Sequence, residues 1–344
     1  MGFASLSRRL PPRPNWPPPF ETLPTEKRAM RLRAIRDGLI ISGWLGTGFA
    51  LVVVTSLVHS LGYDAFSYWS IDFSDLYGRA MNSNFALGAF RYGPPIAFLF
   101  GPLGALPWWL FLWTWLAFMV ALVFWLGGRW ALVLLALPPV ALELYHGNVH
   151  LLIAAAIVLG FRYPWTWAFV FLSKVTPGVG VLWFAARREW RSLAICLGAT
   201  VAVSAVAFVV APNYWREWLD SILSNVSEPQ YYSVPPPVWI RLPLAALLVI
   251  WGARTDRPWT VGVAATLGLP ILWPHGLCVA LAALPFLRRG DRAAAQSEWR
   301  DAVQPRTLMV SLTVVIGLAI ALALLLPGPI SALMEWVSTN FFLT

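Results

Sequence analysis

Charged residues are scarce in this sequence. Only 12% of its 344 residues are Asp, Glu, Lys or Arg, whereas a soluble domain has about one quarter. Hydrophobic residues make up 58% of the chain, and its mean hydropathy is +0.66. This composition excludes an ordinary soluble protein and predicts an integral membrane protein. The period-two alternation of a membrane barrel is also lacking, so helices are the expected spanning elements.

Cysteines and nucleotide-binding motifs are equally sparse. The two cysteines, Cys196 and Cys278, both lie in apolar runs, which excludes a disulfide framework and a thiolate metal site. The sequence has no glycine-rich phosphate loop, no nucleotide motif and no nucleophilic-serine elbow. An enzyme built on a soluble nucleotide-binding domain is therefore excluded.

What the chain does contain is a series of apolar runs broken by Pro, Gly and short charged clusters. They predict an all-α protein, a polytopic transmembrane helical bundle with about 11 membrane segments that include short or broken helices. The expected segments are residues 38–61, 95–106, 107–127, 131–144, 148–161, 165–186, 191–211, 238–253, 258–273, 276–288 and 307–327. The short runs 131–144 and 148–161 flank the polar tip "LELYHGNVH", which we expect to line a polar cavity.

Basic residues determine the expected orientation. The net charge is +9, and its clusters fall on one side if the spans alternate, which is the positive-inside pattern rather than a nucleic-acid surface. We expect a cytoplasmic Pro-rich and basic segment at 1–37, a single transmembrane domain at 38–327 and an outside tail at 328–344. Outside loops are expected at 62–95 and 212–237. Within the second, "YWREWLDSILSNV" has the spacing of an interfacial helix.

Asp64 is the first candidate for chemistry. It follows the first predicted span in "YDAFSYW", and a carboxylate in an aromatic, partly dry setting suits a general base. The alternative is an ordinary loop acid. For Asp72 and Asp75, in "IDFSDLYGRA", a local cap and a salt bridge from Asp75 to Arg79 are the preferred explanation.

Basic and polar residues supply candidates for an anion site. Arg91 and Tyr92 precede the second predicted span, where an arginine suits a phosphate, although it could also simply reach the interface. Lys174 lies within a predicted span and needs a partner, for which Glu143 is the nearest candidate in sequence. His275 stands at an outside helix junction in "ILWPHGLC". Four polar residues, Glu143, His146, Asn148 and His150, crowd the polar tip, and its two histidines are spaced too poorly to predict a metal site.

Several stretches together resemble the GT-C superfamily and, within it, the glycosyltransferase 87 family, which includes polyprenol-phosphate-mannose-dependent mannosyltransferases. They are the aromatic-flanked Asp64 in "DAFSYW", the "YGPP" before a short span, "PLGALPWW", "HGNVHLLIAAAIVLGF", "FVFLSKVTPGVGVLWFAARREWR" and "PILWPH". The resemblance covers about residues 38 to 290. It departs from the family's pattern at "WPHG", where a double histidine is usual, and at "HGN", where Gly-Gln is common.

The resemblance implies a GT-C fold and an inverting glycosyltransferase in the bacterial cytoplasmic membrane. It implies transfer of a sugar, with mannose as the first candidate, from a polyprenyl-phosphate donor to a lipid or cell-envelope glycan acceptor on the outer face. Asp64 corresponds to the family's catalytic Asp, and His275 to a functional His. No cofactor is implied, although some GT-C enzymes use a divalent metal.

The site expected from residues and resemblance together has Asp64 as the catalytic base. The expected substrate-binding residues are Arg91, Tyr92, His146, Asn148, Lys174 and His275, with no metal ligand. Two other functions stay open. A flippase or transporter of lipid-linked sugars would share broken helices and intramembrane charges but needs no base. A non-catalytic scaffold of a cell-envelope complex would need neither the intramembrane charges nor a catalytic base.

Overall fold

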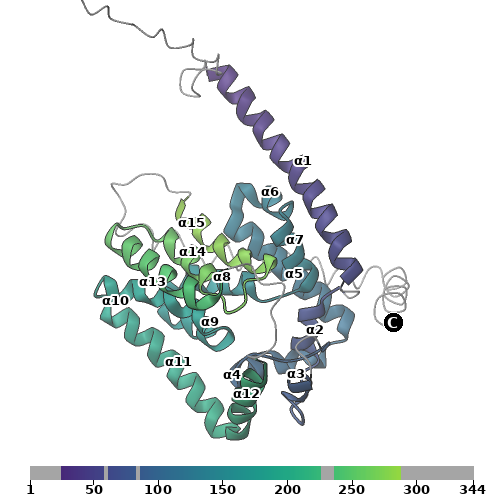
Figure 1. Ribbon diagram of the computed structural model, residues 1–344, viewed down its shortest axis with the longest axis vertical. Helices are drawn as coiled ribbons and strands as arrows, with labels where there is room; N and C mark the ends of the chain where they lie inside the picture. The colour runs from purple at the N-terminus through teal and green to yellow at the C-terminus, as the bar shows by residue number, and fades with distance from the viewer. Residues whose placement is uncertain (1–24, 58–60, 83–85, 226–235, 288–344) are drawn as a thin grey trace, which may run out of the picture. The chain divides into compact units, whose positions relative to one another are not determined.

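The computed structural model describes residues 25–57, 61–82, 86–225 and 236–287. Contacts divide the chain into two units, residues 1–42 and 43–344. Within the described residues, helices are present and strands are not (Figure 1). The α-helices are α1 (Thr25–Leu57), α2 (Tyr63–Trp69), α3 (Gly78–Asn82), α4 (Pro94–Phe100), α5 (Trp108–Gly127), α6 (Ala131–Leu135), α7 (Pro138–His146), α8 (His150–Gly160), α9 (Trp167–Ser173), α10 (Leu182–Ala186), α11 (Trp190–Val210), α12 (Pro212–Asn225), α13 (Val238–Arg254), α14 (Trp259–Leu267) and α15 (Leu284–Leu287).

Short 3-10 helices connect several of these elements. They are η2 (Gly101–Ala105), η3 (Gly128–Trp130), η4 (Pro164–Thr166), η5 (Thr176–Val181) and η6 (Pro274–Ala283). Four of them have a proline at the first or second position, which suits the first helical turn because the missing N–H of proline would have no partner there. Several helices of the described residues are therefore short or interrupted, as the frequent Pro and Gly predict.

Two helical runs in the described residues are long and apolar enough to cross a membrane, Trp108–Leu135 and Trp190–Val210. The pair Pro138–His146 and His150–Gly160, bent by 108°, makes a third if it is counted as one broken span. Only 11% of the most apolar window of Trp190–Val210 is buried, which is the exposure expected of a helix that faces lipid. A helical membrane protein is confirmed, and the eleven predicted segments are not.

Some predicted boundaries are wrong for a clear physical reason. The predicted segment 131–144 divides into α6 and α7, because Leu137 is extended and Pro138 and Pro139 begin a new helix. Conversely, the predicted break between 127 and 131 is only the 3-10 turn η3 inside the run Trp108–Leu135. The predicted span 307–327 and tail 328–344 lie outside the described residues, as does most of the predicted N-terminal segment 1–37.

An aromatic cluster holds α2 against α4 and α5. The rings of Tyr68 and Phe100 have centroids 5.0 Å apart, and Trp115 lies 5.5 Å from Tyr68 and 5.6 Å from Phe100. Such aromatic pairs stabilise by about 0.5 to 1.5 kcal/mol each beyond the area they bury. The helix that carries Asp64 is thus held in place by large buried rings.

Helix η6 is placed by close packing against α7, α8 and α14. A Cβ atom on Gly262 of α14 would lie 2.8 Å from the backbone nitrogen of Ala283 and 2.9 Å from the Cβ of Ala282, so only glycine permits this approach. Arg241, which is buried, donates hydrogen bonds to the carbonyls of Pro236 at 2.6 Å and Leu267 at 2.7 Å. These contacts fix the end of α14 and the segment that leads to His275.

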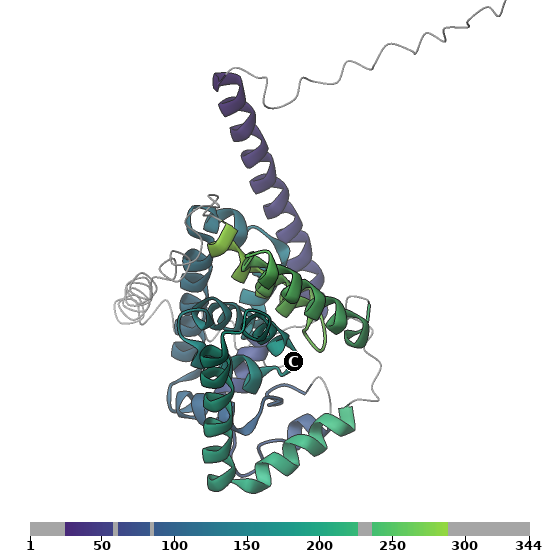
Figure 2. The same cartoon turned by 90° about the vertical axis from the view of Figure 1, so that its left-hand side faces the viewer.

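Helix α12 follows α11 after a sharp corner (Figures 1 and 2). On one side the Tyr214 hydroxyl donates to the carbonyl of Phe73, and Trp218 Nε1 donates to the carbonyl of Arg91 at 3.4 Å. Leu219, Ile222 and Leu223 are exposed. The helix predicted over this segment is confirmed, and its position at a membrane interface stays a prediction.

Candidate active site

Asp64 lies in the first turn of α2, which starts from a strongly constrained position. Gly62 has φ +78°, a conformation that favours glycine. Its backbone N–H donates to the carbonyl of Tyr145 at 2.7 Å, near the end of α7. The start of α2 is therefore tied to the polar tip predicted from the sequence.

The tip itself is a tight turn between α7 and α8. Gly147 has φ +68° and ψ 33°, and its carbonyl accepts a hydrogen bond from Trp115 Nε1 at 2.8 Å. A Cβ atom on Gly147 would lie 2.7 Å from the Cβ of Ala65, so the turn packs directly on α2. Next along the chain, Asn148 Nδ2 donates to Asp64 Oδ2 at 2.7 Å.

Glu143 is fully buried and organises the start of α8. Its Oε1 accepts the backbone N–H groups of His150 at 2.7 Å and of Leu151 at 3.3 Å. Its Oε2 lies 2.9 Å from Nδ1 of the His150 ring. One carboxylate thus caps two N–H groups that have no partner inside the helix, and it also fixes an imidazole.

Lys174 completes this chain of polar contacts. It follows α9 in an extended conformation, so the segment predicted as one span, 165–186, is interrupted there. Its Nζ lies 2.6 Å from His150 Nε2. The predicted pairing of Lys174 with Glu143 is therefore indirect, because the His150 ring stands between them.

His275 and His146 lie beside that chain. The ring centroid of His275, which is buried in η6, is 5.2 Å from that of His150 and 5.1 Å from that of His146. Trp273 stacks on His275 at 6.3 Å between ring centroids. Three histidines, from the end of α7, the start of α8 and η6, therefore meet next to Asp64 and Lys174.

Arg91 and Tyr92 approach from the segment before α4. The backbone N–H of Gly93 donates to the carbonyl of Leu172 at 3.2 Å, close to Lys174. The Tyr92 hydroxyl lies 2.9 Å from the Tyr68 hydroxyl on α2. Burial raises the pKa of Tyr63, the Arg91 guanidinium lowers it and Asp64 raises it. Arg91, which is exposed, is thus within electrostatic range of the first turn of α2.

Glu143, His150 and His275 could be considered as metal ligands, since one ligand atom from each lies within 4.8 Å of the others. The arrangement does not fit a divalent cation well. Both ring nitrogens of His150 already have partners, Glu143 at 2.9 Å and Lys174 at 2.6 Å. A metal ion bound to His150 Nε2 would have to displace an amine that supplies a positive charge in the same place.

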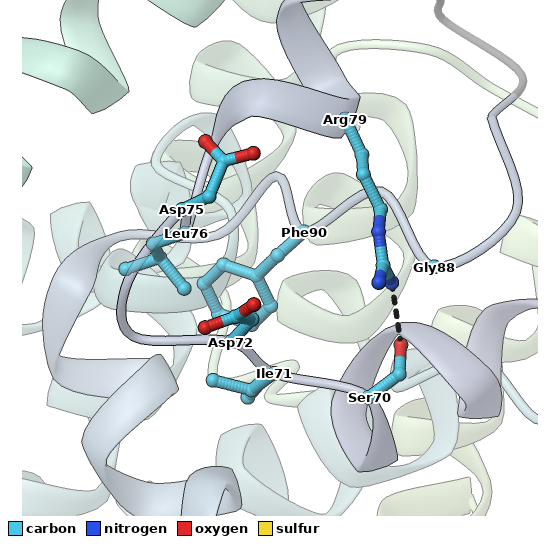
Figure 3. A pocket seen from close by; sticks show the side chains of 8 residues that line it. All are labelled: Ser70, Ile71, Asp72, Asp75, Leu76, Arg79, Gly88 and Phe90. Carbon is cyan, nitrogen blue, oxygen red and sulfur yellow. Dashed lines mark hydrogen bonds between the residues drawn. The ribbon is translucent and has the colours of Figure 1, made fainter.

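Asp72 and Asp75 line a small hollow whose lining includes none of these cluster residues (Figure 3). Asp72 Oδ1 accepts hydrogen bonds from the hydroxyl of Ser74 at 2.7 Å and from its backbone N–H at 2.8 Å, which hold the Asp72 pKa below its usual range. Arg79 points to the Ser70 hydroxyl, 3.2 Å away, so the predicted salt bridge from Asp75 to Arg79 is wrong. Both acids therefore contact residues close to them in the sequence, Ser74 for Asp72 and Gly78 for Asp75.

Most of the residues selected from the sequence therefore lie around one centre. Asp64 and Asn148 touch, while Lys174, His275 and His146 surround His150. Tyr92 is beside α2, and Arg91 is at the exposed margin. Two residues were missing from the expected site, Glu143 and His150, which are the most buried members of the cluster. The sequence did carry a signal for these two residues, because an ionisable residue inside an apolar segment is energetically costly and is usually paired or functional.

No curated protein and no solved structure matches this chain. The sequence matches glycosyltransferase family 87 over residues 90–300. This region contains Arg91, Tyr92, the α7–α8 tip, Lys174 and His275, whereas Asp64 precedes it. Since the match extends over more than half of the 344 residues, the chain belongs to glycosyltransferase family 87.

Proposed function

We propose that this membrane glycosyltransferase moves a sugar, with mannose as the first candidate, from a polyprenyl-phosphate donor to a lipid or cell-envelope glycan acceptor. The transfer inverts the anomeric configuration of the sugar. The observation that carries the proposal is the placement of the partly buried Asp64 carboxylate beside a cluster of Lys174 and three histidine rings. Asp64 lies on a short helix tied to the broken α7–α8 pair, and Lys174 lies at a break between apolar helices. A donor with a lipid tail suits a site of this kind.

The proposed reaction is a single displacement. Asp64 accepts the proton of the acceptor hydroxyl as the acceptor oxygen bonds to the anomeric carbon of the sugar. The bond from that carbon to the phosphate oxygen breaks, and the polyprenyl phosphate leaves with the electron pair. One base and one attack on the face opposite to the leaving group invert the anomeric configuration.

Lys174 is the proposed counter-charge for the leaving phosphate. A cation held in place before the reaction stabilises negative charge as it develops, without reorganisation in the transition state. The contact from Lys174 to His150, and from His150 to Glu143, holds the amine in one place. His275, His146, Tyr92 and Arg91 are proposed to bind the sugar phosphate, and no metal is required.

A direct assay distinguishes this enzyme from a flippase. Purified protein in detergent, where no second leaflet exists, should transfer sugar from polyprenyl-phosphate-mannose to an extract of envelope lipids. Transfer should survive a chelator, because Lys174 supplies the positive charge. Substrate binding without any product would favour the flippase or a scaffold, and loss of transfer with the chelator would contradict the proposed role of Lys174.

We also propose that the site faces the outside of the bacterial cytoplasmic membrane with the N-terminus inside, from the bias of basic residues. In a protein without Cys196 and Cys278, Asn213→Cys on α12 should react with an impermeant thiol reagent in intact cells. Thr255→Cys, in the basic turn between α13 and α14, is the matched control and should react only after lysis. Both positions are exposed. The reverse labelling pattern would invert the orientation.

A further inference from the structure

The orientation of the Asn148 amide is defined by its two partners. Its Oδ1 accepts the backbone N–H of Val149 at 2.7 Å. The other end of the amide, Nδ2, can therefore only act as the donor that faces Asp64 Oδ2 at 2.7 Å. A carboxylate accepts but cannot donate when it is ionised, so the pair is chemically matched.

Asn148 has little freedom to leave this position. It is 6% exposed, and it follows Gly147, whose turn is fixed by Trp115 and packed on Ala65. Glu143 holds the next residues, His150 and Leu151, through their backbone N–H groups. The amide is therefore presented to Asp64 by a turn that is anchored on both sides.

Asp64, by contrast, is only partly buried. Among the described residues, the hydrogen bond from Asn148 to Oδ2 is the one that orients its carboxylate. Without this bond the carboxylate could rotate about its side-chain torsions. With it, Oδ2 is anchored and Oδ1 is left to receive a proton.

We propose that Asn148 is a positioning residue that holds the Asp64 carboxylate in the orientation needed to accept the proton, rather than a residue that binds substrate. This inference rests on the proposed function of Asp64. It revises the role that Asn148 has on sequence grounds alone, where its place in the polar tip indicates a contact with the donor.

Asn148→Asp is the variant that most selectively removes the hydrogen bond to Asp64. It is nearly isosteric and keeps an oxygen to accept the N–H of Val149, but when ionised it cannot donate to Asp64. We expect kcat to fall about tenfold or more while the KM for polyprenyl-phosphate-mannose stays within about twofold, as for an interaction that matters in the transition state. Asn148→Ala, which adds no charge, should show the same division between kcat and KM if the Asp variant does not fold.

The exchanged pair provides the control. Asp64→Asn/Asn148→Asp restores one amide and one carboxylate, so its thermal midpoint in detergent should recover from that of Asn148→Asp. It should still fail to transfer sugar, because the carboxylate now stands on the wrong residue. Four proteins, the wild type, the two single variants and the exchanged pair, are compared for stability and for transfer.

The outcomes separate the two proposals. A wild-type kcat with a raised donor KM in Asn148→Asp would assign Asn148 to substrate binding and overturn the positioning role. Additive stability effects across the four proteins would show that the Asp64 to Asn148 contact contributes nothing. If Asp64→Asn alone transfers sugar normally, the proposed base is wrong, whatever the stability comparison shows.

Discussion

Asp64→Asn should bind the polyprenyl-phosphate donor normally and transfer almost no sugar. The amide keeps the size of the carboxylate and can still hydrogen bond to Asn148, but it cannot accept the proton of the acceptor hydroxyl. Loss of a general base typically lowers the rate about a hundredfold to ten-thousandfold. The measurement is the initial rate of product formation by purified protein, together with donor binding in the same detergent.

Asp72→Asn and Asp75→Asn are the matched controls. Both acids lie in the same predicted outside loop as Asp64 and are exposed, but Asp72 bonds to Ser74, and Asp75 packs its carboxylate against Gly78 at the start of α3. Each variant should keep most of the activity, since a lost cap costs only about 1 kcal/mol of stability. An active Asp64→Asn beside an inactive control would mean that the base is a different acid.

Glu143→Ala should destabilise the protein more than any of these changes. It leaves the backbone N–H groups of His150 and Leu151 and the His150 ring without their buried acceptor. Removing one partner of such a buried polar group costs about 3 to 5 kcal/mol. At roughly 2 to 4 °C for each kcal/mol, the thermal midpoint in detergent should fall by roughly 10 °C.

Glu143→Gln and Asp220→Ala make this test specific. The Gln variant keeps an oxygen for the two backbone N–H groups and should lose less stability than Glu143→Ala. Asp220 forms an exposed ion pair with Arg216, 4.0 Å away on α12, and its removal should cost less than about 1 kcal/mol. A Glu143→Ala protein that unfolds at the wild-type temperature would rule out the proposed anchoring of α8.

The helical membrane class could be predicted from the sequence because apolar runs directly reflect burial and lipid contact. The break around "HGN" was also predictable, since two short apolar runs flank a polar tip, and the structure confirms a bent pair there. The boundary at Pro138 was missed because hydropathy is continuous from 131 to 144, whereas the backbone of the residue before a proline is restricted. A count of membrane spans from hydropathy fails at such breaks.

The candidate site was only partly predictable. Aromatic context and family resemblance indicated Asp64, but its partner Asn148 lies 84 positions away along the chain, a distance that no local pattern spans. The need of Lys174 for a partner was evident from its charge. That the partner is the His150 ring, with Glu143 behind it, depends on how α9 ends and η6 packs, which a single sequence does not encode locally.

The anomeric configuration of the product is the most direct test of the account. Purified protein is incubated in detergent with polyprenyl-phosphate-mannose of known configuration and with envelope lipid acceptors, and the linkage in the product is determined by NMR. One base, Asp64, and one displacement predict that a β-linked donor gives an α-linked product. A β-linked product would require a second displacement and a nucleophile that this account does not contain, and would contradict it.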